Sequence, residues 1–303
     1  MYDIIIIGGG PAGLTAALYA RRAGKRVLII EKGGFGGQMT FSPKIENYPA
    51  FLSVSGSELA DKMVEQVLEQ GADVEVETVT GIERHSDGFH VHCGEKVFAA
   101  KAVIVATGAR HRLLGVPGED KFLGDGVSFC AVCDGAFYKD KHVIVVGGGN
   151  SAVSEALLLS RLCRHVSLVH RRSTFRAAPA ELAALEKQDN VTFCRNSIVT
   201  ELLGRERLTG IRLQNGRELE ISGLFVCIGR TPASALGGEQ LRRTPDGYYC
   251  ADETTRTGLS GVFAAGDVRE KQLRQIVTAV SDGAAAAQQA EHYLGKTSRR
   301  AEI

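Results

Sequence analysis

Two glycine-rich turns constrain the fold of this chain more than any other sequence feature. The first, GGGPAG at residues 8–13, directly follows the apolar run of residues 3–7, which has the pattern of a buried parallel strand. Residues 12–23 then predict a helix, and residues 25–31 predict a second strand. The N-terminal segment therefore predicts a βαβ unit whose first connection is a tight glycine turn.

The same unit recurs in the middle of the chain. GGGNSA at residues 147–152 follows a predicted strand over 142–146 and opens a predicted helix over 151–162, and residues 165–170 predict another strand. One such turn can serve strand-to-helix packing alone. Two copies, each inside a βαβ unit, favour two sites where a helix N-terminus meets the pyrophosphate of a dinucleotide. The residues that define these turns are Gly8, Gly10, Gly13, Gly147, Gly149 and Ala152.

The residue that ends the second strand of each unit distinguishes the two sites. Glu31 stands 23 residues after Gly8, where a carboxylate can accept hydrogen bonds from ribose hydroxyls and would repel a 2′-phosphate. The first site therefore favours an unphosphorylated adenosine. At the same spacing from Gly147 the chain has His170, which is not a carboxylate.

Three arginines, Arg171, Arg172 and Arg176, follow His170. Guanidinium groups match the geometry of phosphate oxygens, so the second site favours NADPH over NADH. The alternative is a solvated basic cluster on the surface. The place of the arginines, just after a predicted strand that follows a glycine turn, favours the phosphate site.

Seven cysteines are present, and only Cys130 and Cys133 form a close pair. Their C-x-x-C spacing, with Asp134 directly after it, permits a reversible disulfide whose thiols can be activated at a helix start. A structural zinc ion needs four ligands, and the sequence has no second pair with this spacing, so no metal is expected. Two unreactive buried cysteines remain the other alternative.

The length and net charge of the chain indicate the number of domains and the kinds of partner to expect. A chain of 303 residues exceeds the usual domain size of roughly 100 to 200 residues, so two domains are expected. The net charge of +1 gives no electrostatic reason to expect a nucleic acid or an anionic membrane as partner. The N-terminus lacks the basic start of a signal peptide, and no apolar run approaches the ~18 residues that span a bilayer. We therefore expect a cytoplasmic protein.

Further predicted elements indicate how the domains are arranged. Residues 102–106, 224–228 and 262–265 each predict a strand with a glycine close behind it, and residues 275–294 predict a helix. Turn-rich sequence places domain boundaries near residues 111 and 242. The last segment is short for an independent domain, so we expect it to rejoin the first. The predicted fold class is α/β, with two Rossmann-like nucleotide-binding domains, the second inserted into a split first domain.

With these motifs in view, nearly the whole chain resembles the low-molecular-weight thioredoxin reductases. The resemblance rests on the two glycine turns and on several further segments. These are GGQ at 36–38, ENYP at 46–49, ATG at 106–108, CAVCDG at 130–135, HRR at 170–172, GVFAAGDV at 261–268 and the pair Arg274 and Gln275.

The resemblance implies FAD in a split domain of residues 1–111 and 242–303, and NADPH in an inserted domain of residues 112–241. The residues that it assigns to FAD are Gly8, Gly10, Pro11, Ala12, Gly13, Glu31, Lys32, Gly37, Gln38, Asn47, Ala106, Thr107, Gly108, Gly266, Asp267, Arg274, Gln275 and Ile276. The residues that it assigns to NADPH are Gly147, Gly149, Asn150, Ser151, Glu155, His170, Arg171, Arg172, Arg176, Ile228 and Gly229.

The resemblance also implies a catalytic relay and a homodimer. NADPH would reduce the flavin, and the reduced flavin would open a Cys130–Cys133 disulfide, with Cys133 facing the flavin. Cys130 would then attack the disulfide of thioredoxin or a thioredoxin-like protein, and Asp134 would supply or accept a proton.

Three other functions stay open. The first is a flavoprotein that oxidises small dithiols with oxygen, although the arginines after His170 argue against it. The second is a reductase that serves another redox carrier, such as a glutaredoxin-like protein. The third is a flavin-binding redox sensor that docks on a partner without turnover.

Overall fold

The computed structural model describes residues 1–301, which divide into two compact units. Unit 1 combines Met1–Arg110 with Thr231–Ile303, and unit 2 is His111–Arg230. The C-terminal segment therefore rejoins the first unit. The chain returns to unit 1 at Thr231, earlier than the boundary expected near residue 242. The Ala233 N–H already donates to the Gly108 carbonyl within unit 1 (3.0 Å).

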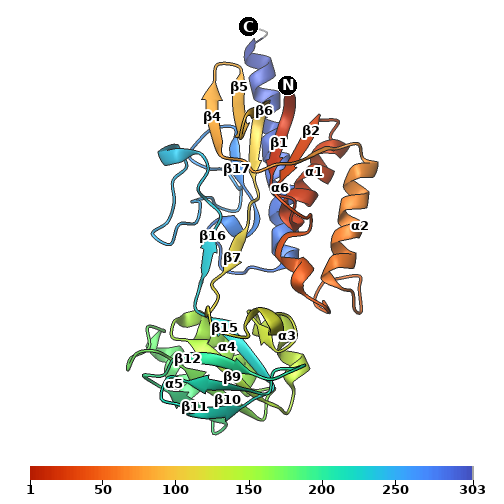
Figure 1. Ribbon diagram of the computed structural model, residues 1–303. Coiled ribbons are helices and arrows are strands. Elements are labelled where there is room, and N and C mark those ends of the chain that lie inside the picture. The colour runs from red at the N-terminus through yellow and green to blue at the C-terminus, as the bar shows by residue number, and fades with distance from the viewer. Residues whose placement is uncertain (302–303) are drawn as a thin grey trace. The chain divides into compact units, whose positions relative to one another are not determined.

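The core of unit 1 is a seven-stranded sheet in the order β3-β2-β1-β6-β5-β4, with β17 also paired to β6 (Figure 1). Strands β1, β2, β3, β6 and β17 are parallel to one another, whereas β4 and β5 form a hairpin whose strand β5 pairs antiparallel with β6. The strands are β1 Tyr2–Ile7, β2 Val27–Glu31, β3 Asp73–Val76, β4 Gly81–His85, β5 Gly88–Cys93, β6 Lys96–Val105 and β17 Val262–Ala264. The isoleucines at positions 4–7 are buried, which explains why this part of β1 is a continuous apolar run.

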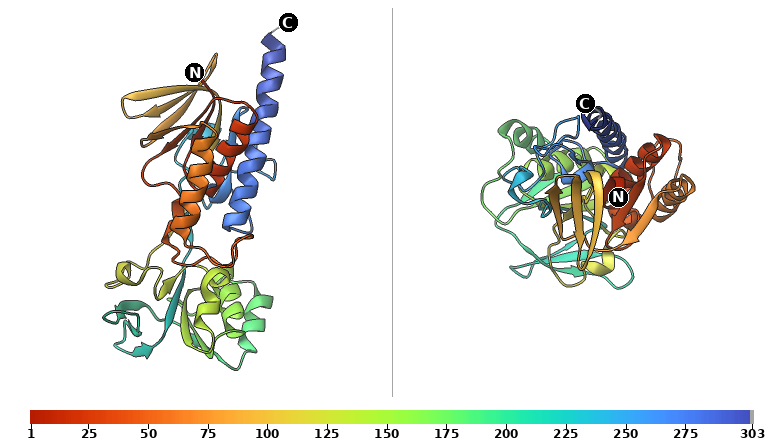
Figure 2. Two further views of the ribbon diagram at one scale, coloured as in Figure 1. Left: turned by 90° about the vertical axis from the view of Figure 1, so that its right-hand side faces the viewer. Right: turned by 90° about the horizontal axis from the view of Figure 1, so that it is seen from above.

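Three helices of unit 1 lie side by side in Figure 2: α2 Gly56–Glu69, α1 Pro11–Arg22 and α6 Ile276–Ala301. Short 3-10 turns are η1 Gly37–Phe41, η4 Gly238–Gln240 and η5 Gly266–Val268. The Ser55 hydroxyl caps α2 by accepting the Glu58 N–H (3.1 Å). Alanines of α1 and α6, among them Ala16, Ala17 and Ala286, are fully buried in one apolar cluster with Ile4 of the sheet. The first and last helices of the chain thus share one core.

Unit 2 is built on a parallel five-stranded sheet in the order β11-β10-β9-β15-β8. These strands are β8 Val127–Ser128, β9 His142–Gly147, β10 His165–Val169, β11 Val191–Cys194 and β15 Gly223–Cys227. A small antiparallel sheet joins β12 Val199–Leu203, β13 Gly210–Leu213 and β14 Glu218–Glu220. The helical segments are η2 Asp120–Phe122, α3 Ala131–Asp134, η3 Gly135–Tyr138, α4 Asn150–Ser160 and α5 Pro179–Glu186.

The two passages of the chain between the units pair with each other. They are β7 Ala109–His111 and β16 Arg230–Pro232, which form a two-stranded sheet. Among the described residues, no helix is both long and apolar enough to cross a membrane.

Candidate active site

The first glycine turn lies where the carboxyl ends of four parallel strands meet. Residue Ile7 of β1 pairs with Ile30 of β2 and with Val105 of β6, and Val105 also pairs with Ala264 of β17. Open α/β sheets bind ligands outside this edge, where the strand order reverses. Most of the predicted FAD residues lie at this edge of unit 1, because they follow these strand ends, lie in η1 and η5, or lie at or just before the start of α6. Asn47 lies in the loop between η1 and α2.

Close backbone packing explains the glycines of this turn. Gly8 has φ +109°, and a β-carbon there would overlap the Ala106 carbonyl. A β-carbon on Gly13 would overlap the carbonyl of Gly8, so α1 could not start as close to β1. Within the described residues, no side chain caps the N-terminus of α1 at Gly10. The first-turn amides of α1 are therefore without a side-chain cap and fit a pyrophosphate.

Glu31 ends β2 and is tied to the glycine turn. Its Oε2 accepts the Gly9 N–H (2.7 Å), and its Oε1 accepts the Gly33 N–H (3.2 Å). These bonds fix the carboxylate beside the turn, and each oxygen keeps capacity for a further donor such as a ribose hydroxyl. Elsewhere in unit 1, the Asn47 amide donates to Gln275 Oε1 (3.3 Å). Two residues that the sequence assigns to FAD, 228 positions apart, are thus in contact.

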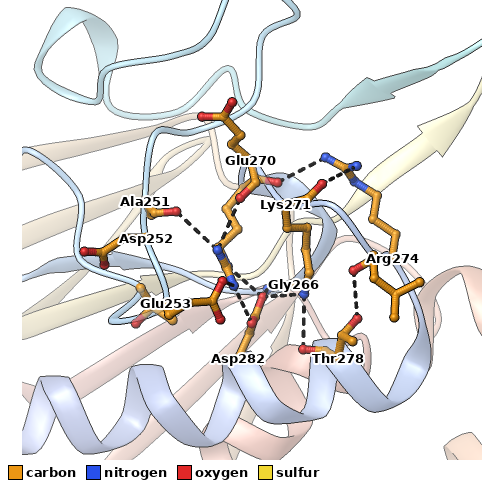
Figure 3. Close-up of polar contacts among 12 residues, drawn as sticks. Ala251, Asp252, Glu253, Gly266, Glu270, Lys271, Arg274, Thr278 and Asp282 are labelled. Carbon is orange, nitrogen blue, oxygen red and sulfur yellow. Dashed lines mark hydrogen bonds and ion pairs between the residues drawn. The ribbon is translucent and has the colours of Figure 1, made fainter. Parts of the chain in front are cut away.

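A buried polar network holds the Gly266–Asp267 turn (Figure 3). The Asp282 carboxylate of α6 accepts the Gly266 N–H (2.9 Å), two bonds from the Arg269 guanidinium (both 2.8 Å) and one from Lys271 Nζ (2.8 Å). The side chains of Arg269 and Asp282 are 2% and 6% exposed. Arg274 extends the network by donating to the Lys271 carbonyl (2.9 Å). The network fixes the turn and the following loop, which carry several of the predicted FAD residues.

Two opposing effects set the charge of Asp282. Burial favours the protonated acid, but the hydrogen bonds from Arg269 and Lys271 prevail and lower the pKa of Asp282 below its ordinary value. The carboxylate therefore stays ionised at neutral pH. Sequence reasoning missed this network, because Asp282 lies 16 residues after Gly266 and inside a helix, where no short motif marks it.

The second glycine turn has the same construction in unit 2. Val146 of β9 pairs with Val169 of β10, and Gly147 pairs with Cys227 of β15. The parallel strands thus bring the glycine turn, the segment after β10 and the segment after β15 to one edge. The predicted NADPH residues follow these strand ends or lie on α4. In the described part of the chain, no side chain caps α4 at Gly149, so this helix start also fits a phosphate.

His170 packs inside the site and not toward solvent. It is 6% exposed, lies against Gly148 and stacks on Phe175 with ring centroids 4.9 Å apart. Burial, together with the nearby arginines, lowers the pKa of His170, so the imidazole is neutral at pH 7. The Arg176 N–H donates to the Gly148 carbonyl (2.7 Å), which ties the basic segment to the glycine turn.

The three arginines after His170 are exposed. Arg171, Arg172 and Arg176 carry their guanidinium groups at the surface beside the second turn. Nearby, the Asn150 side chain accepts the Ala178 N–H (2.8 Å), which closes the segment onto the start of α4. The arrangement can bind a phosphate group on a nucleotide at this edge.

Cys130 and Cys133 form a disulfide, with Cα atoms 5.3 Å apart. Cys130 is the N-cap residue of α3, and the Cys133 N–H points to Cys130 Sγ (3.2 Å). A thiolate released at Cys130 would keep this backbone donor, which favours the ionised sulfur. Five other cysteines are free, and three of these, Cys93, Cys163 and Cys194, are buried. No group of metal-ligating side chains suited to a metal ion was found among the described residues.

Asp134 closes the cysteine turn through Ser128, which sequence reasoning did not single out. The Ser128 hydroxyl donates to Asp134 Oδ2 (2.6 Å) and accepts the Cys130 N–H (3.1 Å). Burial raises the pKa of Asp134, and the Ser128 hydrogen bond opposes that rise. A carboxyl with a raised pKa beside the cysteines can exchange a proton closer to neutral pH than an ordinary aspartate.

Glu155 of α4 contacts the cysteine turn as well as the end of β15. Its Oε2 accepts the Ala131 N–H (3.2 Å) and the Cys227 thiol (3.1 Å). Burial raises the pKa of Glu155, and its two hydrogen bonds oppose that rise. The predicted NADPH residue Glu155 therefore lies between the helix of the redox cysteines and the end of β15.

Comparisons with known proteins agree with this geometry. The family model of the pyridine nucleotide-disulphide oxidoreductases matches residues 2–283. The thioredoxin reductase of Listeria monocytogenes is 44% identical over 300 residues, with 97% of this chain and 94% of that protein covered. The thioredoxin reductase of Treponema pallidum is 42% identical over 299 residues, with 97% of both covered.

A solved structure also matches this chain over nearly its whole length. The thioredoxin reductase of Streptococcus pyogenes superposes with a TM-score of 0.93 at 42% identity, covering 98% of this chain and 99% of that one. This match confirms the α/β fold class predicted from the sequence.

Two dinucleotide-binding units and a cysteine pair at the start of a helix define an oxidoreductase that acts on disulfides. FAD and NADPH are the cofactors of this class, and the two glycine turns fit their pyrophosphates. The chain belongs to the pyridine nucleotide-disulphide oxidoreductase family, and within it to the low-molecular-weight thioredoxin reductases. The resemblance drawn from the sequence is thereby confirmed.

Proposed function

We propose that the protein is a thioredoxin-disulfide reductase that passes electrons from NADPH, through FAD and the Cys130–Cys133 pair, to thioredoxin or a thioredoxin-like protein. The observation that carries this proposal is the Cys130–Cys133 disulfide at the start of α3, in the unit that also holds the second glycine turn. When bound, FAD supplies a two-electron carrier between the nicotinamide and this disulfide.

The chemistry assigned to the chain is thiol–disulfide exchange. Two electrons open the Cys130–Cys133 bond. The Cys130 thiolate then attacks one sulfur of the partner disulfide, forming a mixed disulfide as the partner bond breaks. Cys133 next attacks Cys130 Sγ, which re-forms the internal disulfide and releases the partner as a dithiol. We assign to Asp134 the proton that the leaving partner sulfur needs.

The cofactor residues are assigned from their place at the two sheet edges. FAD is held by the first glycine turn, Glu31, Asn47, the segment after β6, the Gly266–Asp267 turn and the start of α6. NADPH is held by the second turn, Glu155, the three arginines and the segment after β15. We further propose a homodimer that works in the cytoplasm, with neither nucleic acid nor membrane as partner.

The test of the relay is anaerobic titration of the purified protein with NADPH, followed by addition of a cognate thioredoxin while the flavin spectrum is recorded. The proposal requires bleaching by NADPH and recovery on adding thioredoxin. Cys130→Ser should lose the recovery and keep the bleaching. Recovery that only oxygen produces would replace the proposal with a dithiol oxidase, and recovery with another carrier protein would replace only the partner.

The phosphate site is tested separately by Arg171→Ala combined with Arg172→Ala. Each lost charge-assisted hydrogen bond costs about 1.5–3 kcal/mol, so the ratio of kcat/KM for NADPH to that for NADH should fall by about 100-fold or more. Arg205→Ala removes an equally exposed arginine from the β12–β13 loop and should leave the ratio unchanged. An unchanged ratio in the double variant would contradict the assignment.

A further inference from the structure

Three elements of unit 2 meet at one carboxylate oxygen. Glu155 on α4 accepts, on the same Oε2, the backbone N–H of Ala131 and the thiol of Cys227. Ala131 is the first residue of α3, directly after Cys130, and Cys227 is the last residue of β15. The position of the carboxylate is therefore set from two sides, by the helix of the redox pair and by the sheet.

Cys227 can act here only as a hydrogen-bond donor. It is half-buried, and burial and the neighbouring Glu155 charge together raise its pKa well above the ordinary thiol value. A thiol in such surroundings stays protonated and does not compete with Cys130 as a nucleophile. Its proton is directed to Glu155, which is the acceptor found for it.

We propose that Cys227 is a positioning residue of the redox centre: its thiol holds the Glu155 carboxylate against the Ala131 amide, beside the Cys130–Cys133 pair. The proposal rests on the proposed function, in which that pair carries the electrons. It assigns Cys227 a part in the reactivity of the dithiol, although Cys227 lies 94 positions from Cys133 in the sequence.

The charge of Glu155 affects the pKa of the Cys130 thiol. The groups that face Glu155 are Asp134 from α3, Cys227 from β15 and Arg230 from β16. A negative charge held at the start of α3 disfavours a second negative charge on the nearby sulfur, and so raises the pKa of the Cys130 thiol. Loss of the Cys227 donor makes the Glu155 carboxylate less favourable, so Glu155 binds a proton more readily and Cys130 ionises more easily.

The experiment measures the pH at which Cys130 becomes half ionised in the FAD-loaded protein. The holoenzyme is reduced with dithiothreitol, freed of reductant and treated briefly with iodoacetamide between pH 5 and pH 9. The alkylation of Cys130 is then read by peptide mass spectrometry, which separates it from the other cysteines. The variants are Cys227→Ala, Cys227→Ser, Glu155→Gln, and Cys227→Ala combined with Glu155→Gln.

Cys227→Ala should lower the midpoint by about 0.5 pH unit, which is about a threefold rise in alkylation rate below the midpoint. Cys227→Ser keeps a donor at the same place and should restore the wild-type midpoint. Glu155→Gln should lower the midpoint at least as far, and adding Cys227→Ala to it should change nothing more, because both act through one carboxylate.

Several results would overturn the proposal. These are an unchanged midpoint in Cys227→Ala, an equal shift in Cys227→Ser, or additive shifts in the double variant. The assay needs neither NADPH nor thioredoxin. A wild-type protein that fails to reduce thioredoxin would therefore refute the proposed function, while the midpoints would still decide the role of Cys227.

Discussion

At the residue scale, Asp282 shows how much one buried carboxylate can organise. It accepts hydrogen bonds from Gly266, Arg269 and Lys271, and so joins α6 to the turn after β17. Arg269 has a second carboxylate partner, Glu253 (3.2 Å), which is 92% exposed. Arg269 thus forms a buried ion pair with Asp282 and a solvated one with Glu253, and the contributions of the two pairs to stability can be compared directly.

We expect Asp282→Asn to lower the free energy of unfolding by about 3–5 kcal/mol, because it removes the buried carboxylate partner of the Arg269 cation. Glu253→Gln should change that free energy by less than about 1 kcal/mol. Urea denaturation at pH 7, followed by circular dichroism, measures both. Equal effects of the two substitutions would contradict the role assigned to Asp282.

The same variant has a defined pH dependence. Because the folded-state pKa of Asp282 lies below its unfolded value of about 3.9, its contribution to stability is present above that value. The contribution is lost as the pH falls through the folded-state pKa. Below about pH 4 the wild-type protein should therefore lose stability more steeply than Asp282→Asn.

At the scale of elements, the strand-to-helix connection β1–α1 depends on a missing side chain. Alanine at position 13 would gain about 1 kcal/mol of helix propensity over glycine, but its β-carbon would overlap the Gly8 carbonyl. Overpacking of this kind typically costs about 1–3 kcal/mol and moves backbone, so a net destabilisation of up to about 2 kcal/mol should remain. Gly13→Ala should also purify with less bound flavin than the wild-type protein.

Gly33→Ala is the matched control for this prediction. Its β-carbon would meet no atom within 4 Å, although Gly33 also lies beside Glu31 at the same sheet edge. Its melting temperature and flavin content should equal those of the wild-type protein. A Gly13→Ala variant that behaves like Gly33→Ala would show that the close approach of α1 to β1 is not required.

Most parallel strands of the two units could be predicted from the sequence, because strands that are buried on both faces are continuous apolar runs, whereas β3, β8 and β11 were not predicted. Residues 4–7 and 143–146 are such runs, and both lie in strands in the middle of their sheets. The hairpin β4–β5 was not predicted. Its strands mix charged and apolar residues, as in His85 and Phe89, and one face of the hairpin is exposed, so its pattern is weaker.

The residues of the candidate site also divide into those that the sequence predicts and those that only the structure shows. Glycine turns and the C-x-x-C pair are local, so their spacing is visible along the chain. Ser128, Cys227 and Asp282 act through contacts that only folding creates, and no spacing rule connects Cys227 with Glu155, 72 residues earlier. His170 was placed at the correct strand end, yet its burial against Gly148 depends on packing that the sequence does not display.

At the scale of the whole molecule, the two units differ in how they are encoded. Unit 2 is one continuous segment that contains every strand of its two sheets. We expect residues 111–230, expressed alone, to unfold cooperatively on heating, as recorded by circular dichroism. Residues 1–110 alone should show no such transition, because Ala16 and Ala17 of α1 lose the core that they share with α6. Joining residues 231–303 to them through a short linker should restore it.

The split of unit 1 has a consequence for the protein while it is being made. During synthesis β1 and α1 leave the ribosome first and α6 leaves last. The apolar residues of α1 that pack against α6 therefore stay exposed until β17 and α6 have been synthesised. The inserted unit can finish folding in the meantime, since domains fold as units during synthesis. FAD can then bind only late in synthesis, after α6 has been made. A chain that ends before α6 would contain a folded unit 2 but no complete FAD site to accept electrons from NADPH.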